Sequence, residues 1–277
     1  MHYLLYNLEA NNSSSKDNLI KLYSEKFEGI TPIIFNGLDF EKFSKSINKE
    51  DTIILSGGDG TINHFVNLYK KYPFEANILY SADGTGNDFL RDIEKDNLVR
   101  INEYINDLPK VIINNDERYF FNNSSFGLDG TVCEIADILK KKGKKINYTN
   151  IAAKLLLFKY KPTNAKVIVD GKEYNYKNVW LASSMNGRYV GGGMMLAPTQ
   201  DRLGDELSCV VIHGKNRLKI AIAFKTIFTG EHIKKYPKYV DIIKGKNIYV
   251  EFDRPNSIQV DGEVTLNVTS YTAQRGD

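Results

Sequence analysis

Two glycine-rich turns contain the residues best suited to chemistry. The first is Gly57-Gly-Asp-Gly-Thr61, which follows an apolar stretch, and the second is Gly84-Thr-Gly-Asn-Asp-Phe89, which follows the next apolar stretch. Glycine allows tight backbone conformations in which several N–H groups converge on an anion. A helix that begins at such a turn adds its own N-terminal amides. Two such turns in one α/β unit predict a site that handles phosphate.

The first turn matches neither of two common nucleotide motifs. No Gly-Lys-Ser/Thr follows it, so it is not a Walker A loop, and Asn63 stands where the dinucleotide fingerprint has its third glycine. The turn does supply glycine amides, the Asp59 carboxylate, and Thr61 as a cap of the next helix. A tight turn without a ligand is the alternative. In the second turn, Asn87 or Asp88 is equally consistent with an ordinary helix N-cap.

Carboxylates recur later in the chain, in two turn-like segments. The segment Asp201-Arg-Leu-Gly-Asp-Glu-Leu207 could bind Mg²⁺ through oxygen ligands, or form an acidic surface turn. The segment Val260-Asp-Gly-Glu263 has two carboxylates, and its Asp-Gly pair is also typical of a hairpin turn. Between β-type segments lies a glycine-rich loop at 186–198. Composition alone leaves these alternatives open.

The elements that must position the two glycine turns alternate between strand and helix. Strands are expected at 3–8, 31–35, 51–56 and 77–80, and helices at 15–28, 39–47 and 61–72, with helical segments near 86–107. Apolar strands that alternate with amphipathic segments indicate a doubly wound parallel sheet. Ligands of such sheets bind at the carboxyl ends of the strands, which is where both glycine turns are expected.

From about residue 110 the pattern changes to short β-type runs. They include 110–113, 119–121, 166–169, 178–182 and 208–212, with helices expected at 129–142, 147–160 and 216–229. Asp170-Gly171 is typical of a hairpin turn. We therefore predict an α/β domain at 1–115 and a β-rich domain at 116–277, whose last strand could return to the first domain.

Composition limits the classes of function. The 277 residues are 42% hydrophobic and 26% charged, which is ordinary for a globular protein, and the net charge of +3 is too small to indicate nucleic acid as a partner. Two cysteines without metal-type spacing favour the reducing cytoplasm. No run reaches the ~18–20 apolar residues that span a bilayer, so membrane contact is expected to be peripheral. The basic clusters at 140–145 and 234–238 are solvated ends of helices or contacts with an anionic membrane.

With these motifs the chain resembles the diacylglycerol/sphingosine lipid kinase family, and most of all its bacterial diacylglycerol kinases. The resemblance extends through Gly191-Gly-Gly193, Asp205-Glu-Leu207, Gly230-Glu-His232 and Val260-Asp-Gly-Glu263, and so covers nearly the whole chain. The first glycine turn is shared with NAD kinases. The second turn, with Asn-Asp-Phe after Gly-Thr, is characteristic of the lipid kinases.

This resemblance implies an α/β fold of two domains, a nucleotide-binding domain like that of NAD kinases and a β-rich, sandwich-like domain, with the active site in the cleft between them. It implies magnesium bound by the Asp205 carboxylate and the backbone oxygens of Arg202 and Leu207, which would support Asp59, and Asp261 or Glu263 as the general base. ATP would contact Asn7, Gly57, Gly58, Asp59, Gly60, Thr61, Ile62, Asn63, Thr85, Asn87 and Asp88.

The activity so implied is transfer of the γ-phosphoryl group of ATP to a lipid hydroxyl at the inner face of the cytoplasmic membrane. Diacylglycerol, which would give phosphatidic acid, is the expected acceptor, and Asp129 could bind a head-group hydroxyl or cap the next helix. A soluble kinase of the NAD-kinase type is one alternative. A nucleotide-binding regulator without catalysis is another, because the first loop, Asn7–Ser14, lacks the proline and glycine usual in the family. A homodimer is left open.

Overall fold

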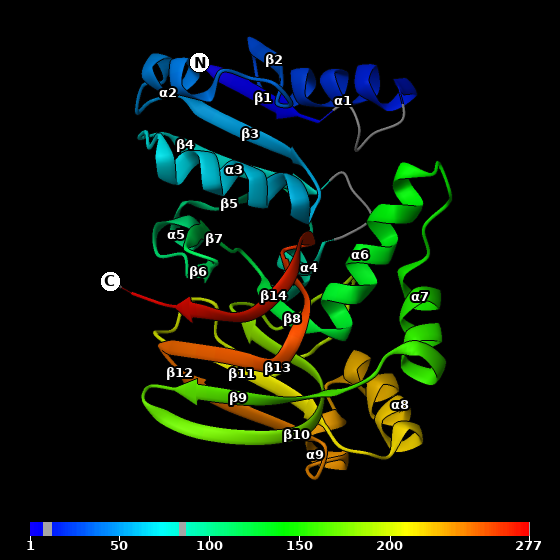
Figure 1. The fold of residues 1–277 in the computed structure, drawn as a ribbon. Helices are drawn as coiled ribbons and strands as arrows, with labels where there is room; N and C mark the ends of the chain where they lie inside the picture. The colour runs from blue at the N-terminus through cyan, green and yellow to red at the C-terminus, as the bar shows by residue number, and fades with distance from the viewer. Residues whose placement is uncertain (8–12, 83–86, 277) are drawn as a thin grey trace. The chain divides into compact units, whose positions relative to one another are not determined.

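The protein consists of two compact units, Met1–Asp107 and Leu108–Asp277 (Figure 1). The computed structural model describes residues 1–7, 13–82 and 87–276. The sequence-based boundary at 115/116 falls inside the second unit. Residues 108–115 belong there because β6 (Lys110–Ile113) pairs with β14 (Glu263–Gln274).

The first unit is built on a sheet of β1 (His2–Tyr6), β2 (Ile30–Ile34), β3 (Thr52–Gly57), β4 (Asn77–Ala82) and β5 (Val99–Arg100), in the order β2-β1-β3-β4-β5. The pairs among the first four strands are parallel, and β5 runs antiparallel to β4. Every residue of β3 is buried, as expected for a central strand with both faces covered. The predicted doubly wound sheet is confirmed. The two-residue strand β5 was not predicted.

Helices cover both faces of this sheet. They are α1 (Ser13–Lys26), α2 (Phe40–Ser46), α3 (Asp59–Lys71), α4 (Asp88–Asp92) and α5 (Asn102–Asn106). On one face, α1 packs Leu19 and Tyr23 against Leu4 of β1. Because successive side chains of a strand alternate, Tyr3 points to the other face, where its ring meets Phe43 of α2 at 5.7 Å.

The second unit is an antiparallel sheet of nine strands. They are β6, β7 (Asp116–Tyr119), β8 (Asn123–Gly127), β9 (Thr163–Val169), β10 (Lys172–Met185), β11 (Leu207–His213), β12 (Val240–Gly245), β13 (Asn247–Val260) and β14. Strand β9 pairs with both β10 and β13, which folds the sheet around one apolar cluster, and a second cluster lies between the sheet and the helices of this unit. The predicted strand 119–121 is wrong beyond Tyr119, because Phe120 and Phe121 are buried outside the ladder.

The helices of the second unit are α6 (Leu128–Lys141), α7 (Tyr148–Lys154), α8 (Arg217–Thr226) and α9 (His232–Lys235). The predicted helix 147–160 changes to a π-helical turn, η1 (Leu155–Lys159), where the Tyr160 N–H donates to Leu155 O at 2.8 Å. Helix α8 continues as the 3₁₀ turn η2 (Ile227–Thr229). The hairpin predicted at Asp170-Gly171 is confirmed, with φ of 48° and 82°.

Candidate active site

Three strands of the first unit end together at one edge of the sheet. Tyr6 of β1 is in register with Ser56 of β3, which is in register with Ser81 of β4. Asn7 and the Gly57–Asn63 segment therefore lie at the same carboxyl edge, as the sequence predicted. Of the predicted nucleotide-binding residues, Thr85 lies outside the described part of the chain. Most of the altered first loop, residues 8–12, lies outside it as well.

The first glycine turn leads directly from β3 into α3. Gly57 has no room for a side chain, since a Cβ there would lie 2.3 Å from Thr61 Oγ1. The N–H groups of Thr61 and Ile62 both donate to Gly58 O, at 2.9 and 3.2 Å, so the hydrogen-bond ladder of the helix begins at these two donors. The amides before Thr61 are not part of that ladder. This geometry is the one in which helix N-termini bind phosphate.

The residues after this turn mainly support the helix. Ile62 is fully buried, and Thr61 and Asn63 are 7% and 5% exposed. The Ile62 side chain packs in the core, which leaves it no ligand-facing surface of its own. Gly60, in contrast, is exposed, and Gly58 and Asp59 are half-buried. A phosphate at this edge would therefore meet Gly58, Asp59 and Gly60 first.

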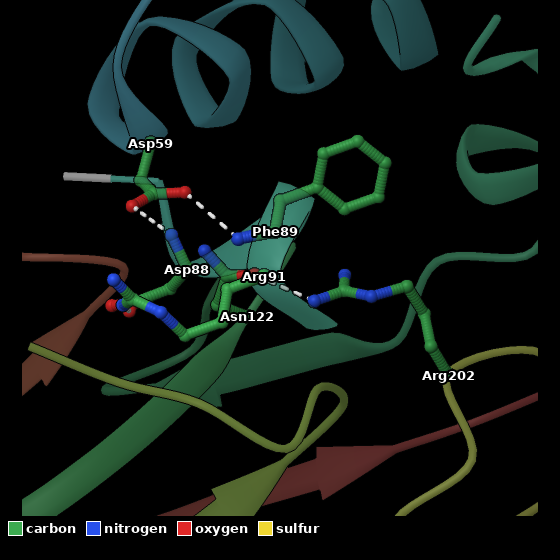
Figure 2. A network of polar contacts seen from close by, with 6 residues as sticks. All are labelled: Asp59, Asp88, Phe89, Arg91, Asn122 and Arg202. Atoms are coloured by element: carbon green, nitrogen blue, oxygen red, sulfur yellow. Dashed lines mark hydrogen bonds and ion pairs between the residues drawn. The ribbon is translucent and has the colours of Figure 1, made fainter. Parts of the chain in front are cut away.

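Asp59 connects the two glycine turns. Its carboxylate accepts hydrogen bonds from the backbone N–H groups of Asp88, at 3.0 Å, and Phe89, at 3.3 Å (Figure 2). These donors are the first two residues of α4, so the acid of the first turn caps the helix that follows the second turn. Asp88 is itself buried, and its Oδ1 atom forms an ion pair with the Arg91 guanidinium at 3.3 Å. The two motifs thus form one hydrogen-bonded unit.

Asn87 contributes an unusual acceptor beside this cap. It is the N-cap residue of α4, yet its side chain makes no capping hydrogen bond. Its Oδ1 atom is buried and has no hydrogen-bond partner in the part of the chain that the structure describes. A buried acceptor left unpaired costs about 1–3 kcal/mol, so a donor is expected to satisfy it. The amino and hydroxyl groups of a nucleotide are donors of this kind.

In the second unit, Asp261 anchors the backbone that leads into β8. It occupies the β13–β14 hairpin turn, with φ of 47°, followed by Gly262 at 93°. Its Oδ1 accepts hydrogen bonds from the N–H groups of Asn122, at 2.8 Å, and Asn123, at 2.9 Å, while Oδ2 accepts one from the Phe121 N–H. A carboxylate has about four lone-pair sites, and these backbone donors take three of them.

Glu263 lies in more open surroundings than Asp261. Its side chain is 65% exposed, and it lies 3.9 Å from the Arg118 guanidinium, a long ion pair. Its carboxylate therefore faces solvent. The sequence offered Asp261 and Glu263 as equal candidates for the base, and the structure places them in different surroundings.

The predicted magnesium ligands fit a metal poorly. The Arg202 guanidinium donates to Asn122 Oδ1 at 2.7 Å (Figure 2) and to Phe121 O at 2.6 Å. The carbonyl oxygen of Arg202, one proposed ligand, accepts a hydrogen bond from Arg275 at 2.8 Å. A dication and a guanidinium about 5 Å apart repel each other by roughly 7 kcal/mol at an effective dielectric constant of about 20.

The rest of this ligand set offers little compensation. Asp205 is an exposed carboxylate in the turn, and Leu207 begins β11, in register with Gly245 of β12. No group of three or more His, Cys, Asp or Glu side chains able to hold a metal occurs among the described residues. Arg202 and Arg275 instead hold this turn. Sequence analysis missed Arg275, because its partner Arg202 lies 73 residues away.

Phe126 of β8 and Asp129 of α6 both make contacts within the second unit. Phe126 is fully buried in the core, stacked on Phe252 with 4.1 Å between ring centroids. Asp129 does not cap α6, whose N-cap is Gly127. The Asp129 carboxyl accepts a hydrogen bond from Gln259 Nε2 at 2.7 Å. Burial raises its pKa, and hydrogen bonds from Gln259 and neighbouring side chains act in the opposite direction.

Comparison with known proteins agrees with this architecture. Residues 2–119 match the family described as diacylglycerol kinase catalytic domain, and residues 122–273 match the YegS C-terminal NAD kinase beta sandwich-like domain. A diacylglycerol kinase of Mycobacterium tuberculosis is 25% identical over 223 residues, which are 77% of this chain and 70% of that protein. Two crystal structures of Bacillus anthracis proteins have the same fold. One has a TM-score of 0.73 and 18% identity, covering 100% of this chain and 94% of the other. The second, of a diacylglycerol kinase, has a TM-score of 0.64 and 17% identity, covering 99% and 94%.

Proposed function

Because the chain belongs to the diacylglycerol kinase-like family of lipid kinases, we propose that it transfers the γ-phosphoryl group of ATP to a lipid hydroxyl. The proposed acceptor is diacylglycerol, and the product phosphatidic acid. The M. tuberculosis relative, which is named a diacylglycerol kinase, supports this choice. The proposed site of action is a membrane surface on which the protein lies peripherally.

The observation that carries the proposal is the bridge made by Asp59. By accepting the Asp88 and Phe89 amides, its carboxylate fixes the second motif relative to the first. The amides before Thr61 would bind the phosphates, and Asn87 Oδ1 would accept a donor of the nucleotide. Phosphoryl transfer depends mainly on such positioning and on neutralisation of phosphate charge.

We assign proton removal from the attacking hydroxyl to Glu263. Its exposed carboxylate has oxygens available, whereas three backbone N–H groups occupy those of Asp261. Magnesium that arrives with ATP would neutralise phosphate charge. We do not assign a second magnesium ion to Arg202, Asp205 and Leu207, since the Arg202 carbonyl already faces a guanidinium.

The test is transfer from γ-labelled ATP to a panel of lipids in mixed micelles, with magnesium, alongside NAD and a control without acceptor. A labelled lipid supports the proposal and names the acceptor. A labelled dinucleotide would replace it with an NAD-kinase-type activity. ATP binding without transfer to any acceptor would favour a nucleotide-binding regulator.

A further inference from the structure

Two helical segments of the second unit expose a group of large apolar side chains. In η1, Phe158 is 79% exposed and Leu157 38%. In α8, Leu218 is 70% exposed and Ile222 49%, and Phe228 of the following η2 turn is 51% exposed. Single exposed apolar residues are normal on protein surfaces, but a concentration in adjacent segments requires an explanation. We call these five residues the outer apolar face.

Helix α8 is apolar on two opposite sides. Ile220 and Ala223 are fully buried and hold the helix to its own unit. Leu218 and Ile222, one helical turn apart, point away from that side. A surface helix normally has one apolar stripe and a polar opposite face. The inner stripe explains how α8 packs, so the outer stripe needs a partner outside the fold.

Arg217 fixes the two segments to each other. Its guanidinium donates to Leu156 O at 2.5 Å and to Tyr160 O at 2.7 Å, at the end of η1. The same group lies 4.7 Å from the centre of the Trp180 ring. Figure 1 shows α8 beside the end of the segment that begins with α7. The first turn of α8, with Leu218, is thus held against the turn that carries Phe158.

The two segments that carry this face contain charges of one sign only. Residues 148–161 and 215–230 contain no Asp or Glu, although the whole chain has 37 Lys and Arg against 34 Asp and Glu. They contain six lysines: Lys154, Lys159, Lys161, Lys215, Lys219 and Lys225. All six are exposed, and no ion pair is recorded for any of them within the described ranges. Lysines beside exposed apolar groups favour an anionic lipid surface.

We propose that the outer apolar face is the surface by which the protein docks on an anionic lipid bilayer. The docking proposal rests on the proposed function in one respect: a lipid acceptor would lie in the bilayer. Phe158, Leu218 and Ile222 would enter the interface, and the lysines would contact the head groups. A second copy of the chain fits less well, because pairing two such faces would bring lysines against lysines. No helix among the described residues is long and apolar enough to cross a membrane.

The test is co-sedimentation of the full chain with phosphatidylcholine vesicles that contain about 30% phosphatidylglycerol. The variant Phe158→Ser/Leu218→Ser/Ile222→Ser should lose about tenfold or more in vesicle partitioning. Leu266→Ser is the control, because Leu266 of β14 is 52% exposed and outside the face. Lys154→Glu/Lys159→Glu/Lys219→Glu should also lose binding. Its control, with the same change in charge, is Lys21→Glu/Lys26→Glu/Lys71→Glu in the first unit.

Two further measurements separate the outcomes. Turnover on a water-soluble short-chain diacylglycerol should be unchanged in the face variants, since that acceptor needs no docking. Wild type that binds vesicles but phosphorylates no acceptor would refute the proposed function and leave the docking surface intact. Unchanged vesicle binding in both face variants would overturn the docking proposal. Light scattering could overturn it as well. That result would be a wild-type dimer that dissociates in the apolar variant only, while the same variant still binds vesicles.

Discussion

The two acids of the Val260–Glu263 hairpin should respond to substitution in opposite ways. Asp261→Asn keeps the shape of the side chain and tolerates the turn, since asparagine adopts a φ near 47° more readily than most residues. In the variant, an amide NH₂ group replaces either Oδ2, which accepts a hydrogen bond from the Phe121 N–H, or Oδ1, which accepts hydrogen bonds from two N–H groups. The substitution therefore tests the carboxylate and leaves the backbone conformation undisturbed.

The cost follows from the hydrogen bonds. With Oδ1 kept, the Nδ2 group faces the N–H of Phe121, a fully buried residue, and orphaning that donor costs about 1–3 kcal/mol. The bonds from Asn122 and Asn123 lose their charge assistance, about 1 kcal/mol each. A loss of about 3 to 5 kcal/mol in the free energy of unfolding lowers Tm by roughly 6 to 20 °C for a unit of this size.

Glu263→Gln should do the reverse. The side chain is 65% exposed and its ion pair with Arg118 is long, so stability should change by less than about 0.5 kcal/mol. Loss of a general base should reduce turnover by about 10²–10⁴. Scanning calorimetry gives the Tm of each variant. Phosphate transfer, measured well below the Tm of both variants, gives turnover. An Asp261→Asn variant that melts with wild type would refute the anchor, and full turnover in Glu263→Gln would refute the base.

Three further predictions concern other parts of the site. Gly57→Ala should lower Tm, because its Cβ would lie 2.3 Å from Thr61 Oγ1. Gly60→Ala should raise the free energy of unfolding by about 0.5–1 kcal/mol, because Gly60 is in a helix and has open space around it. Equal effects of the two substitutions in thermal unfolding would contradict this packing. Since burial raises the pKa of Asp129 in the folded state, its protonated form contributes stability in acid that is lost as pH rises through the folded pKa. Asp129→Asn should therefore raise Tm at pH 7, by a margin that shrinks toward pH 4; a constant margin across pH would count against it. Magnesium without nucleotide should leave Tm within about 1 °C of its value in EDTA, because the Arg275 guanidinium donates to the Arg202 carbonyl oxygen, one of the proposed ligands. A shift of several degrees would support magnesium binding at this site.

The sequence predicted the first unit well because its strands are continuous apolar runs, such as 52–55, bounded by turns. Strand β8 shows what such patterns miss. Its sequence, Asn123-Ser-Ser-Phe-Gly127, has the composition of a turn, yet every residue is buried. The strand exists because β10 and β13 pair with it on both sides, so its conformation depends on residues about sixty and more than one hundred positions away.

Strand β13 was missed for a related reason. Arg254-Pro255-Asn256 carries the residues that usually end a strand, but β13 continues through a shift of register between Glu251 and Asn256. Composition cannot distinguish such an irregular strand from a loop. The neighbouring strand β14 supplies the pairing that keeps the segment extended.

The candidate site was predictable to the level of motifs and unpredictable in the tasks of its acids. Asp59 and Asp261 look from the sequence like catalytic or metal-binding carboxylates, because they stand beside glycine in turns. In the structure both accept backbone N–H groups: Asp59 those that begin α4, and Asp261 those that lead into β8. A carboxylate that accepts backbone N–H groups holds two segments of backbone in a fixed position relative to each other. Phosphoryl transfer depends more on such positioning than on additional bases. This is why we propose an exposed acid, Glu263, as the group that accepts the proton of the attacking hydroxyl.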